Sequence, residues 1–291
     1  MMSILHKGDK VGFIACSDGR DRSKSMIYLT LENMLLAQFG VTAVYAKTFY
    51  AVGDSPFSGT PEERATELMK LYEDKEIKAV FDLSGGNAAN ELLPFINMAV
   101  IKENPKPFVG ISDLSVLNNA LFTLTGITNL HYQVANLLGA DTEFQKELFT
   151  KVFYAEWDNS NQLLTYPYKW LRGSSMEGTV IGGNARCFLK LAGTRYMPSP
   201  NNKLLFLESL GGGPAAIASY LAQLDQLGFL EECNGILLGT FTEMEQSAGS
   251  PTVEELVLTA TEKYGVPVAK TDKLGHGSDS HCLPIGLNLR L

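Results

Sequence analysis

The sequence predicts an α/β protein in which a doubly wound parallel sheet fills the first half and a smaller domain of mixed β and α structure follows. Short apolar runs alternate with amphipathic helical patterns through the first half, as in parallel strands joined by crossover helices. The second half has more strand character and a mixed order, so we do not expect a second parallel sheet there. At 291 residues, the chain is long for one compact core and comfortable for two.

The first two strands are expected at residues 11–15 and 41–46, with a helix over 23–39 between them. Gly40 follows that helix at the position where glycine commonly ends one. The next helix is expected to begin behind Thr60 as N-cap, with Glu63 completing a capping box, and to run to about residue 74. The first half then continues with strand 78–83, helix 90–97, strand 107–111 and helix 113–125.

The second half opens with an expected strand and tight turn at 178–184, followed by a helix to about residue 191. Further strands are expected at 203–208, 235–240 and 266–269, with helices at 214–227 and 251–264, the last behind Ser250 as its cap. A glycine-rich loop at 275–277 precedes a last short strand. Because the periodicity fades between 157 and 175, we expect domains at 1–156 and 176–291 with a junction at 157–175.

Composition and charge exclude several classes of protein. The formal net charge is −8 and no basic stripe is visible, which argues against nucleic acid as a partner. No stretch approaches the ~18 uninterrupted apolar residues of a membrane span. The first residues show no apolar signal region, and the four cysteines are scattered without a CxxC pair. The expectation is a soluble cytoplasmic protein with reduced thiols.

Ser112 lies where the apolar strand 107–111 meets the helix that begins at Asp113. This is the context of a nucleophile elbow, in which a tight turn projects the hydroxyl and the free N–H groups of the helix stabilise a developing oxyanion. The second glycine of G-x-S-x-G is missing, however. The alternative interpretation is that Ser112 or Asp113 simply caps its helix.

Gly85 and Gly86 follow another strand, and paired glycines let backbone N–H groups approach a ligand closely. The alternative is a tight turn between strand and helix. A dinucleotide fingerprint is absent, so no such cofactor is expected.

The acid Glu208 ends the strand 203–208, where it is placed to orient a histidine, although a solvated strand end is the plainer interpretation. His276 is flanked by glycines, so its ring can reach into a cleft. His131 follows a strand and either lines a pocket or packs. The spacing of His276 and His281 matches no zinc motif, so no metal is expected.

Taken together, these segments resemble the LD-carboxypeptidase family of serine peptidases, and the resemblance spans nearly the whole chain. Seven motifs occur in the order of the family. They are Leu5 to Phe13, Phe57 to Arg64, Ser84-Gly-Gly-Asn87 with Glu91-Leu-Leu-Pro94, Gly110-Ile-Ser-Asp113, Ile181-Gly-Gly-Asn184, Leu205-Phe-Leu-Glu208 with Leu238-Gly239, and Gly275-His-Gly277 with Leu283-Pro-Ile-Gly286.

The resemblance implies a Ser-Glu-His triad and a fold of a flavodoxin-like N-terminal sheet with a swivelling β/β/α-type second domain. Ser112 would be the nucleophile, His276 the general base and then acid, and Glu208 the group that orients the imidazole. The main-chain N–H groups of Gly86 and Asp113 would form the oxyanion hole. Substrate contacts are further expected at Gly85, Asn87 and Tyr132. Neither a cofactor nor a metal is implied, and a homodimer would fit the family.

Several positions depart from the family pattern and bear on substrate identity. Ile111 replaces the usual tyrosine before the serine, and His131-Tyr132-Gln133 stands where a glycine-proline pair is common. Glu208 is followed by Ser-Leu-Gly-Gly-Gly instead of a second acid. The triad positions themselves are intact.

Three functions compete. The first is a carboxypeptidase that releases terminal D-alanine from muropeptide tetrapeptides during peptidoglycan recycling. The second is a peptidase of the microcin C immunity type, which hydrolyses the amide of aminoacyl or peptidyl nucleotides; Ser84-Gly-Gly-Asn87 and Leu92-Leu-Pro-Phe95 look closer to this branch. The third, from another class, is a non-catalytic module that binds a peptide or nucleotide, and a reactive-serine probe would distinguish it.

Overall fold

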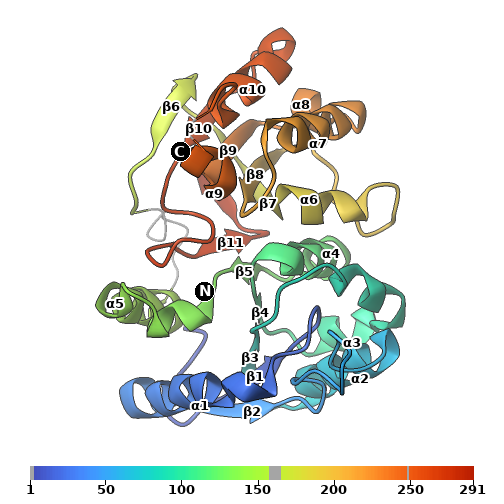
Figure 1. The fold of residues 1–291 in the computed structure, drawn as a ribbon, viewed down its shortest axis with the longest axis vertical. Helices are drawn as coiled ribbons and strands as arrows, with labels where there is room; N and C mark the ends of the chain where they lie inside the picture. The colour runs from blue at the N-terminus through green and yellow to red at the C-terminus, as the bar shows by residue number, and fades with distance from the viewer. Residues whose placement is uncertain (1–2, 157–164, 248) are drawn as a thin grey trace.

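The computed structural model describes residues 3–156, 165–247 and 249–291. Two sheets, each flanked by helices, are stacked along the long axis of the molecule, with the N-terminal half below and the C-terminal half above in Figure 1. The predicted fold class, a doubly wound sheet followed by a mixed β/α part, is confirmed. Within the described ranges, no helix combines the length and the apolar character needed to cross a bilayer.

The first sheet has the strand order β11-β5-β4-β3-β1-β2. Five of its strands are parallel, namely β1 (Lys10–Ile14), β2 (Thr42–Tyr45), β3 (Ile77–Asp82), β4 (Phe108–Val109) and β5 (Asn129–His131). The sixth, β11 (Leu283–Ile285), comes from the far end of the chain and pairs antiparallel with β5. A segment of the second half therefore completes the sheet of the first.

Helices cover both faces of this sheet. One face packs against α2 (Pro61–Glu73), α3 (Met98–Glu103) and α4 (Ser115–Thr125), and the other against α1 (Ser25–Met34) and α5 (Thr142–Phe153). A π-helical turn (Leu35–Phe39) ends the first helix, and short 3-10 helices lie at Arg22–Lys24, Ala89–Phe95, Ser112–Leu114 and Val134–Leu138. The segment predicted as helix 90–97 is thus 3-10, because Pro94 inside it has no N–H for an α-helical bond.

The second sheet has the order β12-β7-β8-β9-β10-β6. Its four central strands are parallel: β7 (Glu177–Asn184), β8 (Lys203–Ser209), β9 (Gly235–Phe241) and β10 (Val268–Lys270). Two antiparallel edge strands, β6 (Lys169–Arg172) and β12 (Asn288–Arg290), make it mixed. Its helices are α6 (Ala185–Phe188), α7 (Pro214–Gln226), α8 (Phe229–Glu232), α9 (Thr242–Ser247) and α10 (Val253–Ala260), with 3-10 turns at Leu189–Leu191 and Glu262–Tyr264.

Two details of the second half differ from expectation. The last long helix is capped by Thr252 instead of Ser250, because Glu255 lies three residues after Thr252 and the two complete a capping box. Strand β6 lies within the range 157–175, where no regular element was expected; residues 157–164 of that range lie outside the described residues. The domain limits at 156 and 176 stay a prediction.

The two halves share one apolar core, which runs from Ile14 in the first sheet to Val268 in the second. Helix α4 lies between the sheets, and its buried Asn119 binds the main chain of Gly182 on β7 twice. The Asn119 side chain donates to the Gly182 carbonyl (2.7 Å) and accepts from the Gly182 N–H (2.8 Å). Gly183 has φ +134°, and a Cβ there would lie 2.4 Å from the Ser115 hydroxyl. Glycine at this position therefore allows α4 to approach β7.

The predicted start of α2 is confirmed and supplies a test of local stability. The Thr60 hydroxyl accepts from the Glu63 N–H (3.2 Å), and the Glu63 carboxylate accepts from the Thr60 N–H (2.8 Å).

Thr60→Ala is expected to lower the free energy of unfolding by about 1 kcal/mol, because it leaves an N–H at the helix start without its partner. Chemical denaturation followed by circular dichroism measures the change. Thr66→Ala, on the exposed face of the same helix, is the control and should cost nothing. Equal losses in the two variants would contradict the role of the cap.

Candidate active site

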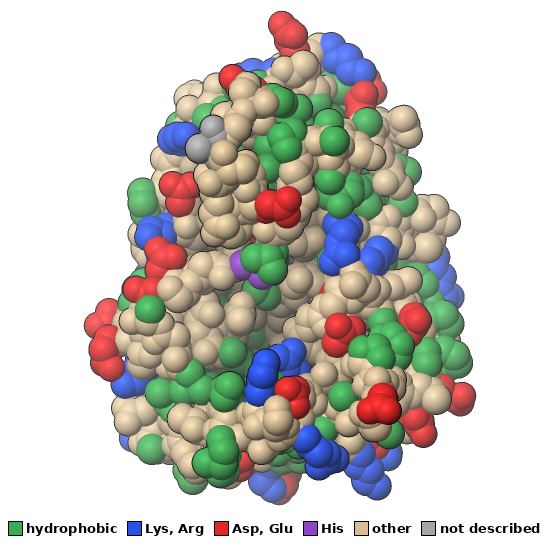
Figure 2. All heavy atoms as spheres, in the orientation of Figure 1, with side chains coloured by type: hydrophobic (Ala, Val, Ile, Leu, Met, Phe, Trp, Pro, Cys, Tyr) green, Lys and Arg blue, Asp and Glu red, His purple; other side chains and the backbone are tan. Residues whose placement is uncertain are grey.

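A cavity of about 480 Å³ lies at the carboxyl ends of strands β3 and β4, where the two halves meet. The first half contributes the segments after β3, β4 and β5, and the second half contributes Leu210 and His276. Figure 2 shows a hollow at mid-height, with a histidine at its upper edge and Lys or Arg side chains below it. This is the edge of a parallel sheet at which ligands bind.

Ser112 lines this cavity in an unusual backbone conformation. Its φ of +59° is left-handed, a region that non-glycine residues enter at a cost of about 1–3 kcal/mol. The residue lies in the turn between β4 and α4, and its side chain makes no capping hydrogen bond there. The strained turn directs a half-exposed hydroxyl into the cavity, as a nucleophile elbow does.

The fully buried carboxylate of Asp113 fastens this turn to its surroundings. It accepts hydrogen bonds from the Ser17 hydroxyl (2.7 Å) and the Ala89 N–H (2.8 Å), and it pairs with the Lys190 ammonium. Burial opposes ionisation, but the bonds from Lys190, Ala89 and Ser17 outweigh it and hold the pKa of Asp113 below its ordinary value. The side chain of Asp113 is therefore structural, and its main-chain N–H is what remains for a ligand.

The glycine loop after β3 is shaped by Asp82 and Asp18. Asp82 accepts from the Ser84 N–H (2.8 Å) and hydroxyl (2.6 Å) and from the Cys16 N–H (2.8 Å), which turns the chain sharply. Gly86 has φ +136°, and a Cβ on it would lie 2.3 Å from the Asp18 carboxylate. Only glycine fits this position without displacing Asp18.

His276 and Glu208 come together as the sequence suggested. Glu208, fully buried at the end of β8, lies 2.7 Å from the Nδ1 atom of His276 through its Oε2 atom. The chain before the histidine passes through Gly275 at φ +138°, where a Cβ would lie 2.0 Å from the Thr240 hydroxyl. The second ring nitrogen, Nε2, has no hydrogen-bond partner among the described residues, and the ring lines the cavity together with Ser112.

Of the three residues expected to contact substrate, two line the cavity and one does not. Gly85 and Tyr132 line the cavity, but the Tyr132 hydroxyl is committed to Gln145 at 2.9 Å, so only its ring faces a ligand. Asn87 is not among the lining residues, and its side-chain oxygen pairs with Arg186 instead.

Other lining residues were missed by sequence reasoning. They belong to the segment after β1 and to the loop after β8: Arg20, Lys24, Ile27, Tyr28 and Leu210. The sequence feature that could have indicated them is the polar run Asp18 to Lys24, which directly follows the first strand and so lies at the carboxyl ends of the strands, as Ser112 does.

Two further histidines, His131 and His281, pack against aromatic rings, whereas His6 is exposed. His131 is buried edge-on against Phe206, with ring centroids 5.1 Å apart, and burial lowers the pKa of His131 to about 4. His281 lies between Phe144 and Tyr166, and burial lowers the pKa of His281 to about 4 as well. The described part of the chain holds no cluster of three or more His, Cys, Asp or Glu arranged for a metal ion.

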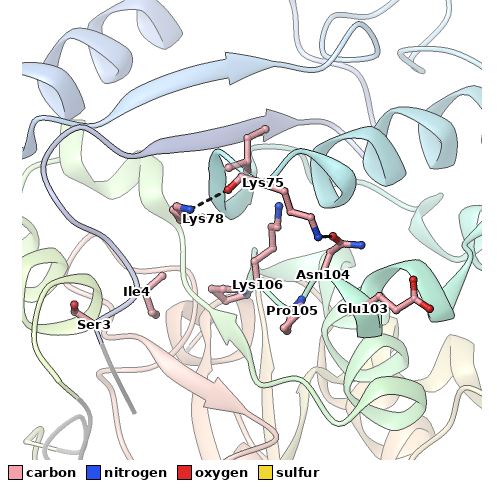
Figure 3. A pocket seen from close by; sticks show the side chains of 10 residues that line it. Ser3, Ile4, Lys75, Lys78, Glu103, Asn104, Pro105 and Lys106 are labelled. Atoms are coloured by element: carbon pink, nitrogen blue, oxygen red, sulfur yellow. Dashed lines mark hydrogen bonds between the residues drawn. The ribbon is translucent and has the colours of Figure 1, made fainter.

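A second cavity, of about 350 Å³, lies at the amino ends of strands β3 and β4 (Figure 3). The buried ammonium of Lys106 donates there to the carbonyls of Leu71 (3.0 Å) and Asp74 (2.6 Å) at the end of α2. Burial lowers the pKa of Lys106 to about 8. The dashed lines in Figure 3 show that Lys75 and Lys78 are also engaged, with Asn104 and the Lys75 carbonyl. These lysines hold a helix end, and neither Ser112 nor His276 lines this cavity.

Comparison with known proteins matches both halves of the chain to one family. The LD-carboxypeptidase N-terminal domain matches residues 11–132, and the LD-carboxypeptidase C-terminal domain matches residues 177–291. A probable murein peptide carboxypeptidase of Bacillus subtilis (strain 168) is 29% identical over 97% of this chain and 88% of its own. The microcin C7 self-immunity protein MccF of Escherichia coli is 26% identical over 99% of this chain and 91% of its own. The structure of MccF with aspartyl sulfamoyl adenosine shares the fold, with a TM-score of 0.89 at 22% identity over 100% of this chain and 95% of that one.

Gly86→Ala is expected to lower the free energy of unfolding by about 1–3 kcal/mol, because alanine is strained at this φ and its methyl group meets Asp18. Gly85→Ala is the matched control, since its added Cβ meets no atom within 4 Å. Urea denaturation of both variants measures the difference. If the neighbouring glycines tolerate alanine equally, the assigned loop geometry is wrong.

His131→Phe is expected to make the protein less sensitive to acid. The pKa of His131 is about 4 in the folded protein, whereas an unfolded histidine titrates at about 6.5. Below about pH 6.5 the unfolded chain binds the proton first, so stability is full above that pH and falls toward pH 4.

Unfolding free energies at pH 7.5 and pH 5.0 should show that wild type loses about 1–2 kcal/mol more than His131→Phe over this interval. His6→Gln, at an exposed histidine, is the control and should follow wild type. An unchanged acid sensitivity in His131→Phe would contradict the buried, neutral state.

Proposed function

The chain belongs to the LD-carboxypeptidase family of peptidases, and on this basis we propose that it is a serine-type peptidase whose triad is Ser112, His276 and Glu208. The observation that carries the proposal is the shared cavity. A strained serine from one half and a histidine from the other line it, and a buried carboxylate holds that histidine at 2.7 Å. Triads are recognised by such roles, whatever their order in the chain.

In the proposed mechanism, the Ser112 hydroxyl attacks the scissile carbonyl carbon while Nε2 of His276 accepts its proton. Glu208 accepts the hydrogen bond from Nδ1, which fixes the tautomer and stabilises the imidazolium. The N–H groups of Gly86 and Asp113 stabilise the oxyanion of the tetrahedral intermediate.

Collapse of the intermediate breaks the C–N bond. The leaving amine takes the proton from His276, and an acyl-enzyme on Ser112 remains. Water then attacks the acyl carbon, with His276 accepting a proton from the water and returning it to Ser112. The net reaction is hydrolysis of one amide bond, and every proton passes through a single ring nitrogen.

For the substrate we propose a muropeptide tetrapeptide from which terminal D-alanine is released. A relative over nearly the whole chain is named a probable murein peptide carboxypeptidase. The second candidate is the amide of an aminoacyl or peptidyl nucleotide, supported by the match to a self-immunity protein over 99% of the chain and by the sequence of the Ser84 to Asn87 loop. We further propose a cytoplasmic homodimer, which fits the family.

Ser112→Ala is expected to lower kcat/KM for D-alanine release by about 10⁴-fold or more, because the nucleophile is lost while binding remains. Free D-alanine released from a tetrapeptide measures this, with an aminoacyl sulfamoyl adenosine assayed in parallel. Ser84→Ala is the matched control. Ser84 also lines the cavity, but its hydroxyl is bound to Asp82, so this variant should keep activity within about tenfold of wild type.

A fluorophosphonate probe separates catalysis from mere binding. It should label wild type and Ser84→Ala but not Ser112→Ala. Turnover of the adenosine compound alone would assign the chain to the nucleotide branch. Labelling of Ser112→Ala, or its undiminished turnover, would refute the triad.

A further inference from the structure

One side of the candidate active site is lined by two cationic side chains, although the protein has a net charge of −8. Arg20 and Lys24, from the segment after β1, line the same cavity as Ser112 and His276. Asp82 is the one acid lining it among the described residues, and both of its oxygens accept hydrogen bonds from Ser84 and Cys16. Neither cation forms an ion pair with a described residue, although the carboxylates of Asp18 and Asp21 are near enough to interact with them electrostatically.

The guanidinium of Arg20 is held in place for a ligand. Its Nε–H donates to the Tyr28 hydroxyl at 2.8 Å, and its main chain is fixed by bonds to Phe49 (2.8 Å) and Ala51 (2.9 Å). Its two terminal Nη groups have no hydrogen-bond partner among the described residues. A guanidinium fixed through Nε presents a planar fork of N–H donors, which matches the two oxygens of a carboxylate, sulfonyl or phosphoryl group.

The acidic neighbour of Arg20 does not occupy this fork. Asp18 lies close enough to interact electrostatically with Arg20, but its carboxylate is directed to the Gly86 and Asn87 main chain, where it accepts the Asn87 N–H. Both arginines of this segment lie over a tyrosine ring, Arg20 at 5.7 Å from the centre of Tyr28 and Arg22 at 4.8 Å from the centre of Tyr50, but only Arg20 lines the cavity.

We propose that Arg20, assisted by Lys24, binds an anionic group of the substrate and thereby selects which amide bond reaches Ser112. The inference rests on the proposed function and adds a chemical requirement to it, namely an oxyanion close to the scissile amide. Two sources supply that chemistry: the terminal carboxylate of a peptide, and the sulfamoyl or phosphoryl group of an aminoacyl nucleotide. A cavity of about 480 Å³ has room for either next to the scissile bond.

The test measures binding without turnover, on the full chain carrying Ser112→Ala. The probes are a muropeptide tetrapeptide with a free terminal carboxylate, the same peptide with a terminal amide, and aspartyl sulfamoyl adenosine. Calorimetry gives the three dissociation constants. The free acid should bind about tenfold to a hundredfold more tightly than the amide, as expected for charge-assisted hydrogen bonds.

Arg20→Gln should bring the acid and the amide within about threefold of each other, because the fork that distinguishes them is gone. Arg22→Gln, two residues away and outside the cavity, should keep the full preference. Arg20→Lys keeps the positive charge but loses the planar fork of donors, so it should keep only part of the preference for the free acid over the amide. This variant decides the question if Arg20→Gln does not fold.

The adenosine arm identifies the source of the anion. Weaker binding of the free acid alone in Arg20→Gln places a carboxylate at Arg20, whereas weaker binding of the adenosine compound alone places its sulfamoyl group there. The inference is overturned if Arg20→Gln changes neither, or if none of the three probes binds.

Because binding is read without hydrolysis, failure of the triad is seen separately, in the serine labelling and the D-alanine release.

Discussion

Two hydrogen bonds between the Asn119 side chain and the main chain of Gly182 fasten helix α4 of the first half to strand β7 of the second. A buried amide that binds a strand at both its N–H and its carbonyl acts like a short added strand, and leaving either group unpaired would cost about 1–3 kcal/mol. The glycine at 183 lets helix α4 come close enough for these bonds to form. Ser112 begins the 3-10 turn that leads into α4, and β7 lies beside β8, which carries Glu208. The contact therefore joins the two segments that bring the residues of the proposed triad together.

The site itself combines several locally unfavourable features. Ser112 has a left-handed backbone, and Glu208 is a fully buried carboxylate with one hydrogen-bond partner among the described residues. Each feature alone lowers the free energy of unfolding, as strained backbones and buried charges at functional sites commonly do. The surrounding core compensates, because strands β8 and β9 pair along their length and α4 is buried on several sides. The strained backbone of Ser112 is thus held by the packing of the core around it.

The features that could be predicted from the sequence are those whose conformation depends on residues only a few positions apart. The capping box at Thr60 and the end of the first helix at Gly40 depend on local backbone geometry, and both are confirmed. The meeting of Glu208 with His276 was reached through resemblance to a family, since their spacing of 68 residues carries no local signal. Arg20 was missed because its position depends on contacts with Tyr28 and Phe49. The Thr252 cap was missed because Ser250 offered a rival signal two residues earlier.

The antiparallel pairing of β11 with β5 has a consequence for how the chain is made. Domains commonly fold as they leave the ribosome, the N-terminal one first. Here the first sheet does not receive its outer strand until Leu283–Ile285 has been synthesised, so β5 is left as an open edge while the second half of the chain is made. An open edge is a template for pairing with other chains. The nascent protein therefore passes through a period in which β5, at the edge of its N-terminal sheet, is open to pairing with other chains, and the pairing of β11 with β5 ends that period.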